Sequence, residues 1–200
     1  LSQPDGQWCT LSNKSGTVGS ADVTNVNVTC VEATNCKAIH TADATAPTGF
    51  YTLDTDSAGA TPSMNAYCDM TTAGGGWTQV FDHDVSKGYR AYNTWASVNP
   101  TLPNTGLYSI LDTLAALKSG ANYEFYMTWP AGVAAVTGKS IQWTQVENPT
   151  AVTDPTAVTI SNVTMNPVSQ VGCTPFAGLA KKTANTYLSG ERGGCWWFSI

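Results

Sequence analysis

The chain has 200 residues, of which 42% are hydrophobic, so it can bury a sizeable core and fold as one main domain, with room for a small appendage. Charged residues make up only 12% of it, with nine Lys and Arg against 14 Asp and Glu. Because phosphate binding needs clustered cations, this composition argues against nucleic acid as a partner. The chain also lacks an apolar run of about 18 residues, which argues against membrane insertion.

The cysteines indicate where the protein works. Six Cys stand well apart and form no CxxC pair, a pattern that predicts three disulfides formed in an oxidising compartment. Low charge combined with abundant Thr, Ser, Asn and Gly is typical of extracellular β-proteins, whose polar strand faces are neutral. We therefore expect a secreted or cell-surface protein with a surface suited to neutral polar ligands.

Residues 1–35 form a distinct segment. Cys9 and Cys30 flank a turn-rich stretch at 13–16 and an alternating run at 26–30, which together predict two strands tied by a disulfide. A lone hairpin is only marginally stable in water, so this one is expected to complete something larger. Its Gly-Gln-x-Cys-Thr start and Val-Thr-Asn-Val-x-Val-Thr-Cys finish resemble the end of a tandem repeat of bacterial surface proteins.

Strands dominate the rest of the chain. Short strands are predicted at 49–53 and 65–70 around a small-residue loop, and another at 77–81 follows three consecutive glycines. Alternating apolar residues predict further strands at 123–129, 141–146 and 158–165. One helix is predicted at about 105–119, ending at Gly120, because its apolar residues recur at helical spacing: Leu107, Ile110, Leu111, Leu114 and Leu117.

Four segments in sequence carry a family resemblance. These are Cys36-Lys37-Ala38-Ile39, Gly49-Phe50-Tyr51-Thr52-Leu53, Tyr67-Cys68-Asp69-Met70-Thr71-Thr72 and Gly74-Gly75-Gly76-Trp77-Thr78. Their order and spacing resemble the opening of fibrinogen C-terminal-like domains. Between residues 140 and 194 too few residues remain for the calcium and ligand loops of vertebrate members, so bacterial fibrinogen-like proteins and intelectin lectins are the nearer comparison.

The resemblance implies an α+β, β-rich fold for residues 36–200, with short antiparallel sheets, one main helix and long irregular loops. It also implies a disulfide between Cys36 and Cys68, because the first two cysteines pair in that family. Once that pair and the hairpin pair are assigned, Cys173 and Cys195 remain as the third disulfide.

An acidic, histidine-containing turn is the candidate metal site. Asp82, His83 and Asp84 follow the 77–81 strand directly, and calcium prefers such hard oxygen ligands. Intelectins, in the resemblance, have a similar calcium segment at a similar place. Asp54, Asp56 and Asp69 contribute if folding brings their loops together. The alternative is a solvated acidic turn.

Aromatic residues are the candidate ligand contacts, because flat rings stack on sugars or cage acetyl and ammonium groups. Trp129 and Trp143 fall on alternating strands, where a buried core role is the competing interpretation. The predicted ligand-binding residues are those in the loop after the acidic turn and in the terminal strand: Tyr89, Tyr92, Asn93, Trp95, Trp196 and Trp197.

Catalysis is not expected. The chain has only two histidines, His40 and His83, disulfide pairing would leave no thiol nucleophile, and no Gly-x-Ser-x-Gly elbow is present. The leading hypothesis is a non-catalytic, lectin-like recognition domain that binds cell-surface or extracellular glycans or acetylated groups, with calcium as the candidate ion. The alternatives are a structural or protein–protein adhesion module of a surface or pilus assembly and, less favoured, a hydrolase.

Overall fold

The computed structural model describes residues 2–88, 96–129, 138–166, 176–181 and 188–189. The chain divides into two compact units. Unit 1 comprises Leu1–Gln79 with Thr101–Pro103, and unit 2 comprises Val80–Pro100 with Asn104–Ile200. The sequence predicts a boundary at residue 35, between a segment that resembles the end of a repeat and the recognition domain, and this boundary stays a prediction. No helix in the described part of the chain is long and apolar enough to cross a membrane.

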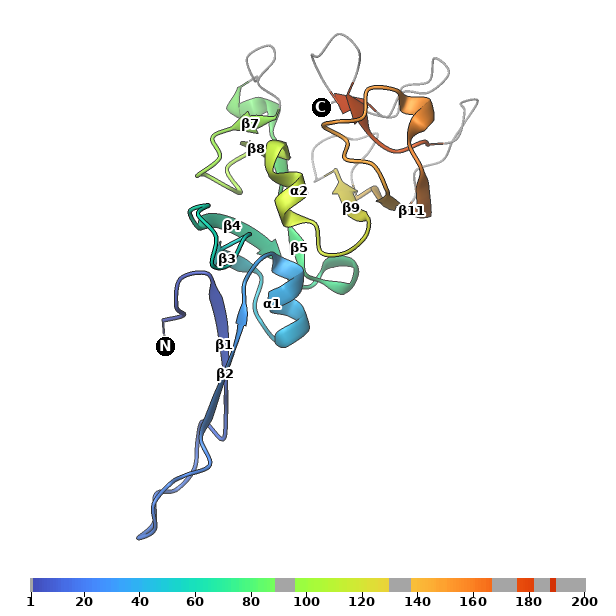
Figure 1. The fold of residues 1–200 in the computed structure, drawn as a ribbon. Coiled ribbons are helices and arrows are strands. Elements are labelled where there is room, and N and C mark those ends of the chain that lie inside the picture. Colours follow the sequence, from blue (N-terminus) through green and yellow to red (C-terminus); the bar gives the residue numbers. More distant parts are fainter. Residues whose placement is uncertain (1, 89–95, 130–137, 167–175, 182–187, 190–200) are drawn as a thin grey trace. The chain divides into compact units, whose positions relative to one another are not determined.

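Unit 1 begins with a two-stranded hairpin. Strand β1 (Gln7–Ser12) pairs antiparallel with β2 (Asn27–Glu32), and Cys9 lies directly opposite Cys30. These two cysteines form a disulfide, which confirms the predicted hairpin and its cross-link. Figure 1 shows the connection between the strands extending well beyond the rest of unit 1.

A short helix that sequence analysis did not predict follows the hairpin. Helix α1 (Cys36–Ala42) begins at Asn35, whose side-chain oxygen accepts a hydrogen bond from the backbone N–H of Ala38 at 2.9 Å. This N-cap satisfies a backbone donor that the first helical turn leaves unpaired. Ile39 is fully buried, so the helix is held by one apolar contact face as well as by its cap.

A three-stranded antiparallel sheet completes unit 1. It consists of β3 (Gly49–Leu53), β4 (Met64–Asp69) and β5 (Trp77–Thr78), in the order β3-β4-β5. Cys36 on α1 and Cys68 on β4 form a disulfide, as the resemblance implied, and neither is exposed. A 3-10 turn (Thr72–Gly74) precedes β5. A Cβ on Gly75 would lie 2.2 Å from the carbonyl oxygen of Met70, so the chain here requires glycine.

In unit 2, the helix predicted at about 105–119 is mostly absent. The segment predicted as helical from residue 105 begins as strand β8 (Leu107–Ile110), which lies between β6 (Phe81–His83) and β7 (Ser97–Val98). A 3-10 turn (Leu111–Thr113) and one turn of helix, α2 (Leu114–Leu117), follow it. Tyr108, Ser109 and Ile110 are all buried, so the strand shows no alternation in sequence and its apolar spacing imitates a helix.

The predicted α+β fold class with one main helix is therefore wrong. Within the described residues the α-helices have only seven and four residues, and small antiparallel sheets make up most of the regular structure. The molecule is broadly all-β. The expected helix failed because a strand buried on both faces offers the same apolar residues as an amphipathic helix.

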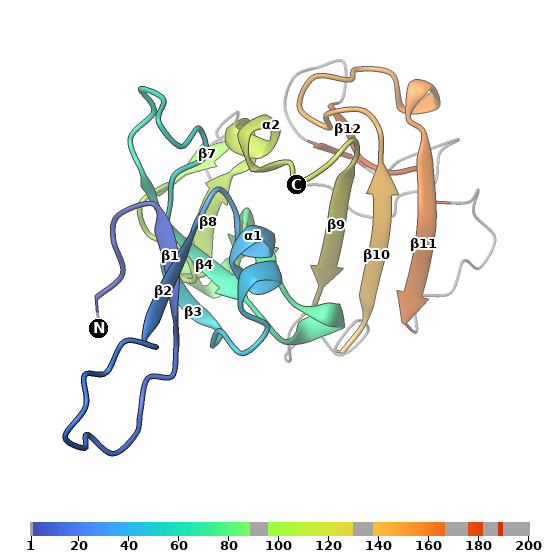
Figure 2. The ribbon, with the colours of Figure 1, turned by 60° about the horizontal axis from the view of Figure 1, so that its bottom comes forward.

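The second sheet of unit 2 contains the three strands predicted from residues 123–129, 141–146 and 158–165. Strands β9 (Tyr123–Thr128), β10 (Ser140–Gln145) and β11 (Ile160–Asn166) lie side by side with β10 in the centre (Figure 2). Short elements accompany them: 3-10 turns at Val85–Lys87 and Pro155–Ala157, and a pairing of β12 (Ala180–Lys181) with β13 (Leu188–Ser189).

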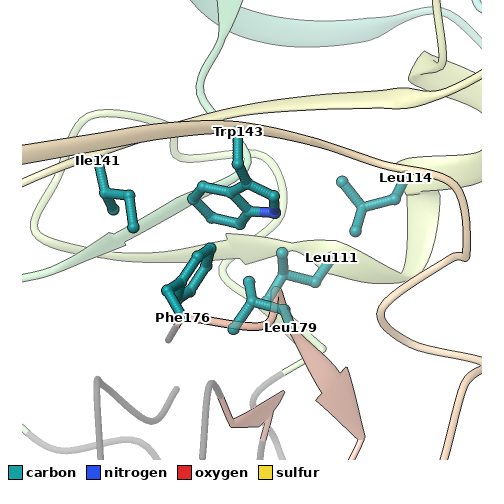
Figure 3. Close-up of a cluster of buried hydrophobic side chains, with 6 residues drawn as sticks. All are labelled: Leu111, Leu114, Ile141, Trp143, Phe176 and Leu179. Carbon is teal, nitrogen blue, oxygen red and sulfur yellow. The ribbon is translucent and has the colours of Figure 1, made fainter. Parts of the chain in front are cut away.

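One face of this sheet buries the core of unit 2. Figure 3 shows Trp143 from β10 with Ile141 and Leu114 to either side and with three further apolar side chains together on one side of its ring: Phe176, Leu111 and Leu179. The ring of Trp143 stacks on Phe125 at 4.9 Å and meets Phe176 edge-on at 5.0 Å. Trp143 is 1% exposed, so its role is structural and not that of a ligand contact.

Candidate ligand-binding site

The ligand-binding residues predicted from sequence lie outside the described part of the chain. The same holds for the predicted third disulfide. Their assignment stays a prediction for Tyr89, Tyr92, Asn93, Trp95, Trp196 and Trp197 as ligand contacts and for Cys173 and Cys195 as a cross-link.

The predicted metal-binding triplet lies at the end of β6. Asp82 accepts a hydrogen bond from the backbone N–H of Gly106 at 2.7 Å, and the backbone N–H of Asp84 donates to the carbonyl oxygen of Gly106 at 2.6 Å. Between them, His83 lies 3.4 Å from the Gly88 carbonyl oxygen through Nε2. The side chain of Asp82 on β6 is thus hydrogen-bonded to the backbone immediately before β8.

The carboxylate of Asp84 has a local role as well. It accepts a hydrogen bond from the backbone N–H of Ser86 at 2.8 Å, and hydrogen bonds from Ser86 hold the pKa of Asp84 below its ordinary value. In the part of the chain that the structure describes, no group of three or more His, Cys, Asp or Glu side chains is arranged to hold a metal ion. Calcium at Asp82, His83 and Asp84 stays a prediction.

Unit 1 presents a second candidate, the outward face of the β3-β4-β5 sheet. Successive side chains on a strand point to opposite faces, and directly paired residues share a face. Leu53, Ala66 and Cys68 point to the buried face, where none of them is exposed. The pairs Phe50 with Tyr67, Thr52 with Asn65, and Trp77 with Asp69 consequently share the other face. We call this set the aromatic face: Phe50, Thr52, Asn65, Tyr67, Asp69 and Trp77.

Three aromatic rings lie along the aromatic face, one from each strand. Phe50 is 58% exposed, and its ring meets that of Tyr67 edge-on at 5.3 Å. The indole N–H of Trp77 donates a hydrogen bond to the carbonyl oxygen of Thr72 at 2.8 Å, which fixes the orientation of that ring. An exposed phenyl ring held by a neighbouring ring costs free energy in water and is a surface on which a ligand can stack.

Polar side chains stand among these rings. Thr52 and Asn65 are exposed on neighbouring strands and offer a hydroxyl and an amide. Asp69 is half-buried; its burial favours the neutral acid, but hydrogen bonds from Thr72 and Thr71 outweigh that effect and hold the pKa of Asp69 below its ordinary value. The aromatic face therefore combines apolar rings, neutral hydrogen-bonding groups and one carboxylate that is charged at neutral pH.

Sequence analysis did not select these residues as ligand contacts. Phe50, Tyr67 and Trp77 were noted only as part of a family resemblance, although alternation within 49–53 and 65–70 was the signal that could have found them. Phe50 and Tyr67 occupy the positions between residues of the buried face. What the sequence could not supply was the register that pairs Phe50 with Tyr67.

Comparison with known proteins adds no assignment. No protein-family model matches the chain, and no solved structure matches it.

Proposed function

We propose that the chain is a non-catalytic extracellular recognition domain that binds neutral glycans through the aromatic face of unit 1. The observation that carries the proposal is the exposed Phe50 ring, held edge-on against Tyr67 on a sheet backed by a buried disulfide. Sugars have apolar C–H faces that stack on such rings and hydroxyl groups that need neutral hydrogen-bonding partners. Thr52 and Asn65 supply such partners beside the rings.

Rigidity of the supporting strands favours recognition. The disulfide between Cys36 and Cys68 ties α1 to β4, and the backbone N–H of Cys36 donates to the hydroxyl of Thr78 on β5 at 3.1 Å. A ligand that binds a preformed surface does not have to order it, which leaves more of the contact energy for affinity. The resemblance of residues 36–78 to fibrinogen C-terminal-like domains supports the same role.

The cross-links favour an oxidising environment. Two disulfides are consistent with an extracellular protein, because the cytosol keeps most thiols reduced. We place the protein in the secreted or cell-surface fraction, where glycans are the abundant neutral polar ligands.

Glycan-array binding followed by calorimetry on the best ligand tests the proposal. We expect saturable binding that weakens about tenfold in Phe50→Ala, because an aromatic anchor contributes on the order of 1.4 kcal/mol or more. The matched control is Val146→Ala, which removes another exposed apolar side chain from unit 2. Equal affinities of Phe50→Ala and Val146→Ala would exclude the aromatic face as the binding surface.

A chelator separates the aromatic face from the predicted calcium site. Binding through Phe50 and Tyr67 requires no ion, so we expect the same affinity with and without EDTA. Loss of binding in EDTA, together with loss in Asp82→Asn, would instead support a calcium-assisted site at the end of β6.

Exposed valines favour a second candidate, a protein–protein adhesion module. Val18, Val23, Val26 and Val28 lie in or beside the hairpin and are 47–78% exposed. Exposed apolar side chains gathered in one segment are typical of protein contacts. A blank glycan array combined with saturable binding to a purified surface or pilus protein would favour this function over glycan recognition.

A further inference from the structure

The two outer edges of the hairpin differ. On β1, the side chain of Gln3 accepts a hydrogen bond from the backbone N–H of Cys9 at 2.7 Å and donates one to its carbonyl oxygen at 3.1 Å. The amide of Gln3 thus occupies the positions that a neighbouring strand would use. The edge of β1 is closed at Cys9 by the chain itself.

The closed edge of β1 reveals the direction of the backbone groups on β2. Since the N–H and C=O of Cys9 point away from β2, Cys9 and Cys30 form a non-hydrogen-bonded pair, and their Cα–Cα distance of 4.0 Å agrees with the close spacing of such pairs. The N–H and C=O of Cys30 consequently point away from β1. By the two-residue period of a strand, those of Val28 do the same.

The outer edge of β2 is open at these positions. Val28 is 63% exposed and Cys30 is also exposed, and within the described residues no backbone hydrogen bond satisfies the outward groups of either. Proteins protect such edges with charges, proline or bulges. Residues 23–31, Val-Thr-Asn-Val-Asn-Val-Thr-Cys-Val, contain no charge and no proline, and the β1–β2 pairing shows no bulge.

We propose that β2 pairs antiparallel with β2 of a second copy of this chain, forming a two-fold symmetric dimer through a four-stranded sheet. Pairing centred on Thr29 sets Val28 of each copy opposite Cys30 of the other and satisfies the outward N–H and C=O groups of both. It brings no like charges together, because the paired stretch is neutral and Glu32 falls opposite Val26. A two-stranded ribbon is marginal in water, so two added strands also stabilise it.

The difference between the two edges of the hairpin favours a dimer over a longer assembly. Each hairpin has an open edge on β2, which the dimer uses, and an edge on β1 that Gln3 already closes at Cys9. Each outer edge of the four-stranded sheet is therefore blocked at Cys9 by the chain itself. An open edge on both strands would instead permit continued addition of chains.

Light scattering and hydrogen exchange on the purified protein test this pairing. We expect a concentration-dependent dimer in which the amides of Val28 and Cys30 exchange slowly at high concentration and quickly on dilution. The amide of Thr29 faces β1 and should remain protected at both concentrations.

Substitutions on the edge locate the interface. Val28→Lys adds a charge, and Val28→Pro removes an N–H that points away from β1, so neither removes a β1–β2 ladder hydrogen bond. Each should weaken dimerisation at least tenfold, whereas Val18→Lys, with the same added charge outside β2, should not. An intact Cys9–Cys30 bridge by mass mapping verifies that the hairpin has folded. A monomer at millimolar concentration, or a dimer that survives both Val28 substitutions, would overturn the proposal.

Discussion

Each of the two units is stabilised internally by a different kind of cross-link. In unit 1, α1 and β4 are joined covalently, since Cys36 and Cys68 form a disulfide at the centre of the core. In the described part of unit 2, a buried side-chain amide links the chain segments by hydrogen bonds instead. Gln145 is fully buried on β10 and accepts hydrogen bonds from the backbone N–H of Leu179 at 2.9 Å and from the indole N–H of Trp143 at 3.3 Å.

The donor side of that amide completes the network. The side-chain nitrogen of Gln145 donates to the carbonyl oxygens of Leu179 at 2.8 Å and of Glu147 at 2.9 Å. The backbone around Gly178 and Leu179 can approach Gln145 this closely because Gly178 has no side chain. A Cβ at that position would lie 2.6 Å from the Gln145 side-chain oxygen. A fully satisfied polar side chain thus fixes an irregular segment to a sheet in unit 2, whereas a disulfide fixes helix α1 to a sheet in unit 1.

Removing the buried disulfide should have the largest effect. We expect the double substitution Cys36→Ala and Cys68→Ala to lower the free energy of unfolding by about 5 kcal/mol, because it frees the unfolded chain and leaves a cavity in the core. The corresponding change at Cys9 and Cys30 should cost about 3 kcal/mol, since Cys30 is exposed and little packing is lost. Urea unfolding measures both. A greater cost at the hairpin would contradict the assignment of the core of unit 1.

Breaking the buried amide network should have the next largest effect. Gln145→Leu keeps the approximate volume but leaves the buried backbone N–H and C=O of Leu179 unsatisfied, so we expect a loss of about 3 kcal/mol. Gln142→Leu is the matched control, because Gln142 lies half-buried on the opposite face of the same strand, and it should change stability by about 0.5 kcal/mol or less. Unfolding followed by Trp fluorescence decides, and equal losses would show that the network does not fix the segment.

Acid should have the smallest effect, through Asp69. Hydrogen bonds from Thr72 and Thr71 lower its pKa in the folded state, so its stabilising contribution is present above the unfolded-state pKa of about 3.9 and is lost as the pH falls through the folded-state pKa. Asp69→Asn should therefore flatten the decline in stability below about pH 4. The measurement is the free energy of unfolding as a function of pH. If Asp69→Asn lost stability in acid as steeply as the unchanged protein, the carboxylate of Asp69 would not contribute to the acid sensitivity.

Much of the sheet structure could be predicted from sequence. The alternation in 123–129 and 141–146 corresponds to strands β9 and β10, in which alternate apolar side chains pack in the core of unit 2: Tyr123, Phe125, Met127, Ile141 and Trp143. The hairpin and the pairing of Cys9 with Cys30 were likewise predicted and are confirmed. Strands β9 and β10 were predictable because each turns alternate residues toward the core, which a two-residue period records. As the structure describes it, the hairpin has no buried residue and was predicted from its turn-rich stretch and its two cysteines.

The elements that failed are those whose residues do not record a single buried face. Strand β8 is buried on both sides, so its sequence resembles a helix, and α1 is too short for its periodicity to stand out. The predicted strand at 77–81 is divided into β5 and β6. The aromatic face was missed for a related reason: Phe50 and Tyr67 become neighbours only through the register of β3 with β4.

The most direct test of glycan recognition at the aromatic face is an NMR titration with the best-binding sugar from the array, observing backbone amides and the Trp77 indole N–H. We expect the shifts to concentrate at Phe50, Asn65, Tyr67 and Trp77. Shifts that leave these four residues unchanged while a sugar binds saturably elsewhere would contradict it.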